Sequence, residues 1–451
     1  MGTREANPSV RARFATRELS NFATTEAALK ILYISQYFPP EMGAPSARVS
    51  ELAQYWVKEG HQVTVLTGFP NHPNGVVHPE YRRRFRQLVH REQVHSVNVV
   101  RSWLLPFPNR KPYERILNYS SFFASAAITG SFLERPDVVI ASSPQLLVGL
   151  SGWWIARLNR VPFVLEVRDL WPESLVAVGV GDADSALHRV LGRIAGFLYR
   201  QSDHMVVVTP AFEQYLAERW RVPQEKMSVV PNGVQASIFS PRRTNSDLRA
   251  ELGLTEKFVV SFIGTLGLAH GLETLISAAE KCQVEQPAIA FLVVGDGADR
   301  QRIMELAKSK RLGNITFVPQ QLRERIPDYI STSDACLVLL KKSEVFETVI
   351  PTKMLEFMSC ARPVILGVEG QAREIIERSN AGLCIPPENS AALCDAILRL
   401  RNEDWLRERL GCSGREYIVR NFSRDRTASI YLDVLNEVTA GAGVSEAAVA
   451  A

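Results

Sequence analysis

The sequence of 451 residues lacks the cysteine patterns of metal-binding and disulfide-rich proteins. All six cysteines fall in the second half of the chain, no two of them form a CxxC pair, and most sit within apolar segments. Such a distribution predicts reduced cysteines buried in the core of a cytoplasmic protein.

A strong charge bias is also missing. The 52 lysines and arginines nearly balance the 48 aspartates and glutamates, and the formal net charge of +4 predicts no nucleic-acid partner. The two longest uncharged stretches, 116–133 and 138–156, combine Ser, Gly and other residues that a membrane-spanning helix rarely mixes. We expect buried strands and helices there instead.

Both ends of the sequence lack the features of packed structure. Residues 1–28 mix Arg, Glu, Asn and Thr without an apolar segment, which predicts a disordered lead that is neither a signal peptide nor a transmembrane helix. Residues 439–451, rich in Ala, Gly and Val, are predicted to be a disordered tail.

Between the ends, apolar strands alternate with helical patterns, and the length is too great for one core. This alternation predicts an α/β protein made of two Rossmann-like, doubly wound domains that face each other across a cleft. We place the first domain at 29–235, the second at 236–412, with the polar stretch 240–247 as the linker. Helices at 413–438 are expected to pack back on the first domain. The predicted strands are 31–35, 62–67, 97–104, 137–143, 163–169, 205–209 and 227–230, then 258–264, 291–297, 315–318, 335–340, 363–366 and 383–385.

The segment 351–364 (PTKMLEFMSCARPV) places Lys353 and Glu356 in the first turns of a helix between two apolar strands. The helix is expected to begin on Thr352, and its N–H groups and dipole would favour an anion such as a phosphate. The alternative is that Glu356 only stabilises the start of the helix.

Two glycine-bearing loops occupy matching places after the first strand of each domain. The loop 264–271 contains Gly264, Gly267 and Gly271 but matches neither the dinucleotide fingerprint nor the P-loop. Gly43 lies in the corresponding loop of the first domain, before a helix that we expect Ser46 to cap. Both loops would line the cleft, although either could be a plain turn.

Two charged segments of the first domain stand out. At the end of a buried strand, Arg168 and Asp169 follow Glu166, so they either belong to an active site or form an internal ion pair of Arg168 with one of the two carboxylates. The stretch 82–91 carries five arginines among apolar residues, and 103–115 adds further cations and aromatics; either a membrane surface or a solvated face explains them.

Taken together, these segments resemble retaining glycosyltransferases of family 4, which have the GT-B fold. The resemblance covers about residues 29–436 and rests on five motifs in order, with two more typical of the branch that builds bacterial surface polysaccharides. The five are 39–44 (PPEMGA), 60–67 (GHQVTVLT), 229–234 (VVPNGV), 293–297 (VVGDG) and 355–364 (LEFMSCARPV), and the two are 168–174 (RDLWPES) and 350–353 (IPTK).

The resemblance implies that a nucleotide-sugar donor binds to the second domain and that Glu356 holds the ribose hydroxyls of its nucleotide. The family's earlier glutamate falls on Thr348, with Glu347 beside it, and its basic pair falls on Thr265 and His270. Lys353 is the expected replacement at the diphosphate, helped by His270 if that ring is protonated. The donor-binding residues implied are Glu356, Lys353, Thr352, Gly264, Thr265, Gly267, His270, Gly295, Val318 and Thr348.

The resemblance also implies that Arg168 and Asp169, with Lys353, act at the reacting sugar carbon. No metal or other cofactor is expected, and UDP-sugar would be a co-substrate. The acceptor, linked to a polyprenyl phosphate, would lie against Gly43, Tyr37, Phe38, Asn71 and His72, while basic and aromatic patches of the first domain hold the cytoplasmic face of the inner membrane.

Three functions are weighed. The first is transfer of a sugar, expected to be an N-acetylated hexose, from a UDP-sugar in surface-polysaccharide biosynthesis. The second is a nucleotide-sugar epimerase on the same fold, which would need no acceptor. The third is a non-catalytic sugar-nucleotide-binding partner, suggested by the missing glutamate at 348 and the missing basic residues at 265 and 270.

Overall fold

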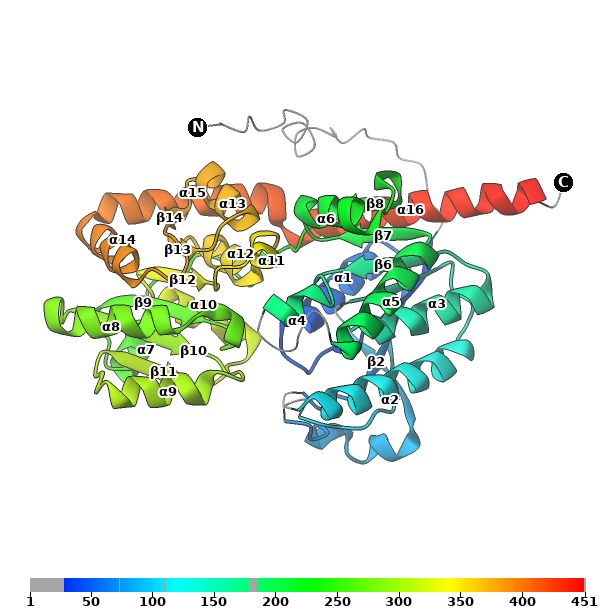
Figure 1. Ribbon diagram of the computed structural model, residues 1–451, viewed down its shortest axis with the longest axis horizontal. Helices are drawn as coiled ribbons and strands as arrows, with labels where there is room; N and C mark the ends of the chain where they lie inside the picture. The colour runs from blue at the N-terminus through cyan, green and yellow to red at the C-terminus, as the bar shows by residue number, and fades with distance from the viewer. Residues whose placement is uncertain (1–27, 73, 109–110, 144, 178–184, 450–451) are drawn as a thin grey trace.

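The computed structural model describes residues 28–449 except 73, 109–110, 144 and 178–184. Within these residues the chain forms two α/β domains side by side, each built on one sheet (Figure 1). Each sheet is covered by helices on its two faces, which is the two-domain arrangement expected from the alternating pattern.

The first domain has an eight-stranded sheet in the order β3-β4-β2-β1-β5-β6-β7-β8 within the described chain. All neighbouring strands are parallel except β3, which pairs antiparallel with β4 at one edge. The strands are β1 Lys30–Ile34, β2 Gln62–Gly68, β3 Val89–Val94, β4 Val97–Ser102, β5 Val138–Ser142, β6 Phe163–Val167, β7 His204–Val207 and β8 Met227–Val229. The helices are α1 Ala44–Lys58, α2 Pro112–Ser131, α3 Leu146–Asn159, α4 Glu173–Ala177, α5 Ala186–Gln201 and α6 Pro210–Trp220.

The second domain has a six-stranded parallel sheet in the order β11-β10-β9-β12-β13-β14 among the described residues. Its strands are β9 Phe258–Ile263, β10 Ile289–Val294, β11 Ile315–Val318, β12 Ala335–Leu339, β13 Val364–Gly367 and β14 Gly382–Cys384. Its helices are α7 Ser246–Glu251, α8 Glu273–Glu285, α9 Arg300–Ser309, α10 Ile326–Ser331, α11 Glu344–Glu347, α12 Thr352–Ser359, α13 Gln371–Ser379, α14 Ser390–Asn402 and α15 Asp404–Phe422.

Most strands are near-continuous apolar runs because both faces of a parallel sheet are buried. Every residue of β5 and of β10 is buried, for example. Strand β3 is different: its residues alternate between exposed and half-buried, and it lies at the sheet edge. The sequence analysis missed β3 because its alternating polar residues gave no apolar run.

The chain passes between the two domains twice, and the two connecting segments lie next to each other. The N–H of Val234 donates to the carbonyl of Phe422 at 2.8 Å, and the N–H of Arg424 donates to the carbonyl of Val234 at 2.8 Å. A side chain could not replace Gly233 here, because a Cβ would lie 2.5 Å from Oγ1 of Thr427. The two crossings therefore form one paired connection.

Helix α16 (Arg424–Val449) returns to the first domain and packs beside α1 (Figure 1). The indole Nε1 of Trp56 donates to the carbonyl of Ala428 at 3.0 Å, and the rings of Trp56 and Tyr431 lie 5.3 Å apart, edge to face. Helix α16 thus completes the core on the face of the first sheet that α1 also covers.

The boundaries differ from the predicted ones in three places. The crossing lies just before residue 235 rather than in the polar stretch 240–247, part of which forms α7. Helix α15 packs against α12, α13 and α14, so the return to the first domain occurs after Phe422 and not at 413. Helix α16 runs to Val449 instead of ending before a disordered tail at 439, because the alanine-rich segment has a high helix propensity. The predicted disordered lead lies outside the described residues, apart from residue 28.

Candidate active site

Helix α12 begins at the place where the sequence predicted an anion site. It starts at Thr352, but Pro351 occupies the N-cap position and no side chain caps the helix. The predicted helix start at Thr352 is therefore confirmed, and the first N–H groups of α12 donate to no cap side chain.

Lys353 is half-buried, and its ammonium Nζ is buried without a protein anion against it. Its Nζ has no hydrogen-bond partner and lies 3.9 Å from the centre of the Phe262 ring. Gly264 makes room for it: the φ of 134° suits glycine, and a Cβ there would lie 3.2 Å from Cε of Lys353. Burial lowers the pKa of Lys353 to about 7. An anion placed next to Nζ would compensate for this desolvation.

His270, in the loop after β9, does not supply a second charge. Its Nδ1 lies 3.1 Å from the carbonyl oxygen of Leu339, which a neutral ring satisfies by donating its proton. Burial, together with the nearby Lys353, lowers the pKa of His270 to about 3. The protonation on which the predicted help of His270 depended is therefore disfavoured. Thr265, in the same loop, is exposed.

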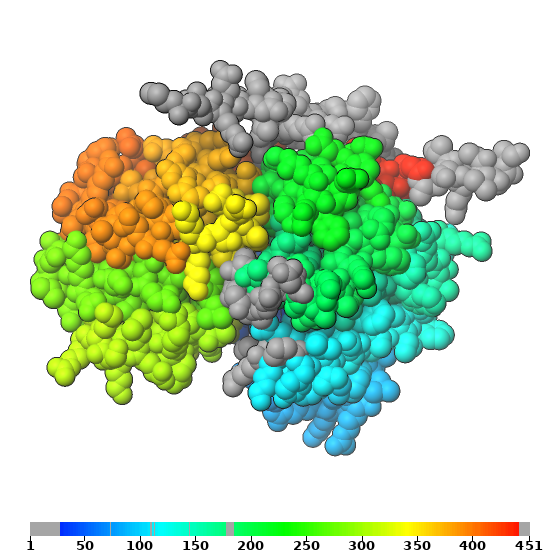
Figure 2. All heavy atoms as spheres, viewed as in Figure 1, coloured from blue at the N-terminus to red at the C-terminus, as the bar shows by residue number. Residues whose placement is uncertain are grey.

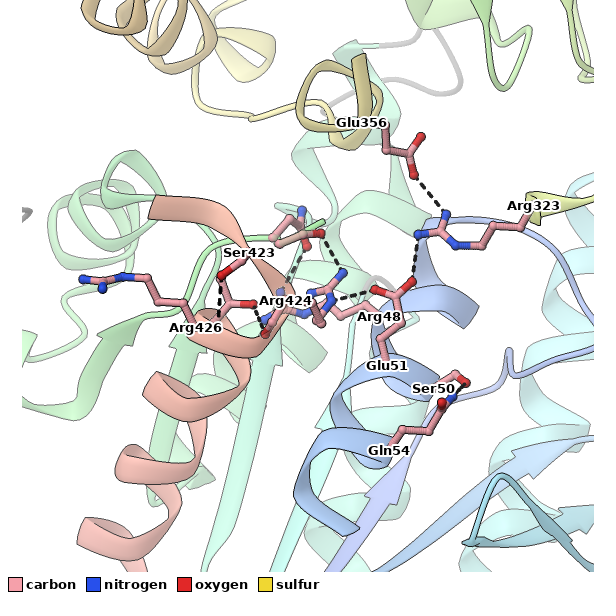
Figure 3. A network of polar contacts seen from close by, with 12 residues as sticks. Arg48, Ser50, Glu51, Gln54, Arg323, Glu356, Ser423, Arg424 and Arg426 are labelled. Carbon is pink, nitrogen blue, oxygen red and sulfur yellow. Dashed lines mark hydrogen bonds and ion pairs between the residues drawn. The ribbon is translucent and has the colours of Figure 1, made fainter. Parts of the chain in front are cut away.

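Glu356 lies one turn beyond Lys353 on α12 and is held by an arginine from another loop. Its Oε1 accepts from Nη1 of Arg323 at 2.9 Å. Nη2 of Arg323 donates to Oε1 of Glu51 at 2.7 Å, and Oε2 of Glu51 accepts from Nε of Arg424 at 2.7 Å. Figure 3 shows this chain of alternating charges, which spans both domains. Burial raises the pKa of Glu356, whereas Arg323 favours its ionised form.

The remaining predicted donor residues fall into two groups. Gly295 and Gly267 belong to the glycine-bearing loops of the second domain, whereas the polar atoms of Thr348 are bonded elsewhere. Gly295 packs against the Gly264 loop, and its N–H donates to the carbonyl of Val318 at 3.0 Å. Gly267 caps the short 3-10 helix that contains His270. The Thr348 hydroxyl instead donates back to the carbonyl of Val345 at 2.7 Å.

Thr348 joins the two domains rather than facing the glycine loop. Its backbone carbonyl accepts from the hydroxyl of Thr209, in the first domain, at 2.8 Å. The position of the family's earlier glutamate is therefore occupied by a residue whose polar atoms are both hydrogen-bonded within the protein.

Arg168 and Asp169, at the end of β6, do not form an ion pair with each other or with Glu166. Both Nε and Nη1 of Arg168 are buried without a partner. The Asp169 carboxylate accepts from the Ser174 hydroxyl and from Nε1 of Trp171, the latter at 3.2 Å. Burial raises the pKa of Asp169. Asp169 thus fixes the turn that follows β6, and Arg168, with two unpartnered guanidinium nitrogens, precedes it in the chain.

Glu166 pairs with Arg48 instead. Its carboxylate accepts from Nε of Arg48 at 2.8 Å and from the hydroxyls of Tyr33 and Ser142, each at 2.7 Å. Arg48 also donates to the carbonyls of Val230 and Pro231 at the first domain crossing. This buried pair fastens α1 and β6 to the crossing segment.

Among the predicted acceptor residues, Asn71 and His72 are organised by a carboxylate that we had not singled out. Oε1 of Glu41 accepts from the backbone N–H groups of Asn71 and His72 at 2.8 and 2.9 Å. The rings of Tyr37 and His72 lie 5.3 Å apart. Burial raises the pKa of Glu41 to about 7.

Two other expectations for this loop are corrected. Phe38 is fully buried in the core of the first domain, so it cannot touch an acceptor. Gly43, and not Ser46, is the N-cap of α1, because Pro45 suits the first turn and the helix starts three residues earlier than expected.

The sequence analysis missed Arg323, Glu51 and Arg424. Glu51 had a signal, since it is a charged residue on the inner face of the amphipathic α1. Arg323 had none, because it lies in an ordinary polar loop. In the part of the chain that the structure describes, no three potential metal ligands cluster together. Across those same residues, no helix has the length and apolarity needed to span a membrane.

Comparison with known families places these features in context. Residues 43–233 match the family described as a glycosyl transferase 4-like domain, and residues 245–417 match the family of glycosyl transferases group 1. The chain belongs to the family 4 glycosyltransferases, and it is a glycosyltransferase by that membership.

Individual relatives match two thirds or more of the chain. The WcaI protein of Escherichia coli K12, named for glycosyl transfer in colanic acid biosynthesis, is 23% identical over 420 residues, which are 90% of this chain and 99% of that protein. The glycosyltransferase WbjE of Pseudomonas aeruginosa is 25% identical over 307 residues, which cover 68% of this chain and 75% of that one.

Solved structures show the same GT-B fold. Sucrose-phosphate synthase of Thermosynechococcus elongatus superimposes with a TM-score of 0.71 at 22% identity, covering 91% of this chain and 99% of that one. Anabaena HepE in complex with UDP-glucose superimposes with a TM-score of 0.68 at 18% identity, covering 91% and 100%. The predicted fold class is confirmed.

Proposed function

We propose that this glycosyltransferase moves a sugar, an N-acetylated hexose, from a UDP-sugar to a polyprenyl-linked acceptor, with retention of anomeric configuration. The reaction would serve bacterial surface-polysaccharide biosynthesis at the cytoplasmic face of the inner membrane. The names of WcaI and of the UDP-glucose complex of HepE support the pathway and the donor. The observation that carries the proposal is the buried, unpartnered ammonium of Lys353 beside Gly264.

The donor would be held by α12 and the glycine loop. The diphosphate would lie next to Nζ of Lys353 and the start of α12, where its charge offsets the desolvation of the ammonium. The ribose hydroxyls would donate to Oε2 of Glu356, since Oε1 already accepts from Arg323. Because Thr265 is uncharged and His270 is neutral, Lys353 carries the electrostatic stabilisation of the leaving group in this loop.

In the proposed reaction the acceptor hydroxyl attacks the anomeric carbon on the face from which UDP departs. The bond between that carbon and the diphosphate oxygen breaks as the glycosidic bond forms. The hydroxyl proton passes to the departing diphosphate or to Asp169, whose pKa is raised by burial. No metal takes part in this proposal.

The test is transfer of label from radioactive UDP-sugars to a membrane lipid extract. Wild type should label lipid, Lys353→Ala and Glu356→Ala should not, and Lys281→Ala, an exposed lysine on α8, should behave like wild type. Formation of an isomeric UDP-sugar without acceptor would instead establish the epimerase. Tight UDP-sugar binding without any product would establish the non-catalytic partner.

A further inference from the structure

The outer face of α2, α3 and α5 has an unusual composition. These three helices lie next to one another over one face of the first sheet and form the cyan to green surface of that domain in Figure 2. They contain five arginines and a single acidic residue, Glu114, which is buried. The whole chain is balanced, with 52 basic and 48 acidic residues, so these helices stand out by their scarcity of acidic residues.

The same face exposes large apolar side chains. Phe132, which directly follows α2, is 80% exposed, and Ile128, one turn earlier, is 64% exposed. Trp154 and Leu158 of α3 are 50% and 53% exposed. Nε1 of Trp154 donates to the Ser131 hydroxyl at 3.1 Å, so the exposed residues of the two helices are neighbours. Scattered exposed apolar residues are ordinary, but a contiguous group of them marks an interaction surface.

This combination fits one kind of occupant. Cations lie on the same group of helices: Arg157 and Arg160 lie on or beside α3, and Arg189 and Arg193 on α5, all exposed. The nearest exposed acid after α2, Glu134, is paired with Lys30. Exposed Trp and Tyr with flanking arginines are the residues that settle in the headgroup region of a bilayer, and anionic lipid attracts the cations.

The orientation of the helices adds a second argument. In a parallel sheet each helix begins at the carboxyl edge of the strand before it, which is the edge that faces the cleft. Tyr113, Ile116 and Leu117 are exposed at the beginning of α2, and Leu187 and Val190 at the beginning of α5. A bilayer against this face would therefore also meet the rim of the cleft.

The stretch 82–91 is a weaker candidate for the same role. Its aromatic residue, Phe85, packs against Phe69 with ring centres 5.2 Å apart, so it is not presented to a membrane. Arg84 lies 3.7 Å from Glu92, which offsets part of the charge. Arg83 and Arg86 remain exposed, and Leu88, which follows them in the chain, is 59% exposed.

We infer that the protein docks on an anionic bilayer through the outer face of α2, α3 and α5, with the cleft rim at the lipid surface. This deepens the proposed function and rests on it for the lipid-linked acceptor. Docking on this face would bring such an acceptor to the cleft without a spanning helix.

The test is flotation of the full chain with vesicles of phosphatidylglycerol and of phosphatidylcholine. Phe132→Ser combined with Trp154→Ser should lower binding to anionic vesicles at least tenfold. Arg157→Ala combined with Arg193→Ala should lower binding to anionic vesicles about fivefold for each charge removed. Added salt should weaken the binding of wild type in the same way. The matched controls lie on the second domain: Val284→Ser, 82% exposed on α8, and Lys281→Ala with Lys308→Ala.

Three results would overturn the inference. They are unchanged binding in both face variants, loss of binding only in Arg83→Ala with Arg86→Ala, or a dimer of wild type that Phe132→Ser dissolves while vesicle binding persists. If the apolar variant fails to fold by thermal melting, the arginine pair decides. UDP binding, measured separately by calorimetry, should be the same in every variant. If wild type binds vesicles but not UDP, that result would contradict the proposed function, while the assignment of this face as the membrane-binding surface would stand.

Discussion

Arg48 of the first domain and Lys353 of the second both have buried charged atoms, and they differ in what surrounds them. Arg48 donates to the Glu166 carboxylate and to two carbonyls of the crossing segment. Lys353 has the face of Phe262 and no hydrogen-bond acceptor. A satisfied buried charge holds a fold together, whereas an unsatisfied one costs stability and is retained where a ligand completes it.

The largest expected effect is on stability, at Arg48, the buried cation whose hydrogen bonds are made within the protein. Arg48→Met should lower the free energy of unfolding by about 3–5 kcal/mol, because it leaves the Glu166 carboxylate buried without its cation. Urea denaturation measures this, with Lys58→Met on the exposed side of α1 as the control. A loss below about 1 kcal/mol would mean that the pair contributes no more than a surface ion pair.

Lys353→Met should have the opposite profile. Transfer should fall about 10²–10³-fold, the usual cost of removing one group that stabilises developing charge. Stability should stay the same or rise, since an unpartnered buried cation is removed. Steady-state kinetics and denaturation of the same preparation, with Lys281→Met beside it, would separate the two. Activity within twofold of wild type would remove Lys353 from the diphosphate site.

Arg323→Met tests the bridge that Arg323 forms between Glu356 of the second domain and Glu51 of the first. Without Arg323 the pKa of Glu356, already raised by burial, should rise further, so the ionised carboxylate is lost as pH falls. UDP binding should weaken about tenfold near pH 6.5, and the ratio of variant to wild-type Kd should shrink toward pH 8.5. A ratio independent of pH would mean that Arg323 acts by direct contact or by structure alone.

The smallest expected effect is the number of protons that the protein takes up when it unfolds or when it binds UDP. The pKa of Lys353 is about 7 and that of an unfolded lysine about 10.5, so between these values the unfolded chain binds more protons and stability should rise with pH. An adjacent diphosphate raises the Lys353 pKa, so UDP binding at pH 8 should take up nearly one proton. Calorimetry in buffers of different ionisation enthalpy measures the uptake, which Lys353→Met should abolish.

The sequence predicted the parallel strands well, because burial on both faces makes each of them an apolar run. It failed where structure depends on partners far away: β3 is an edge strand, and the crossing is defined by the contact of Val234 with Phe422. Lys353 and Glu356 were found together because one helix carries both. The bond from Arg323 to Glu51 joins residues 272 positions apart, and no local pattern signals such a pair.

The pairing of α16 with α1 has a consequence for biosynthesis. The strands and helices of the first domain leave the ribosome early, but Trp56 meets Ala428 and Tyr431 only after the whole second domain has been translated. Until then the α1 side of the first sheet exposes apolar surface that the nascent chain cannot cover from its own domain. The first domain to emerge therefore cannot complete its core until the second domain has been translated, and we expect chaperones to engage that face during the interval.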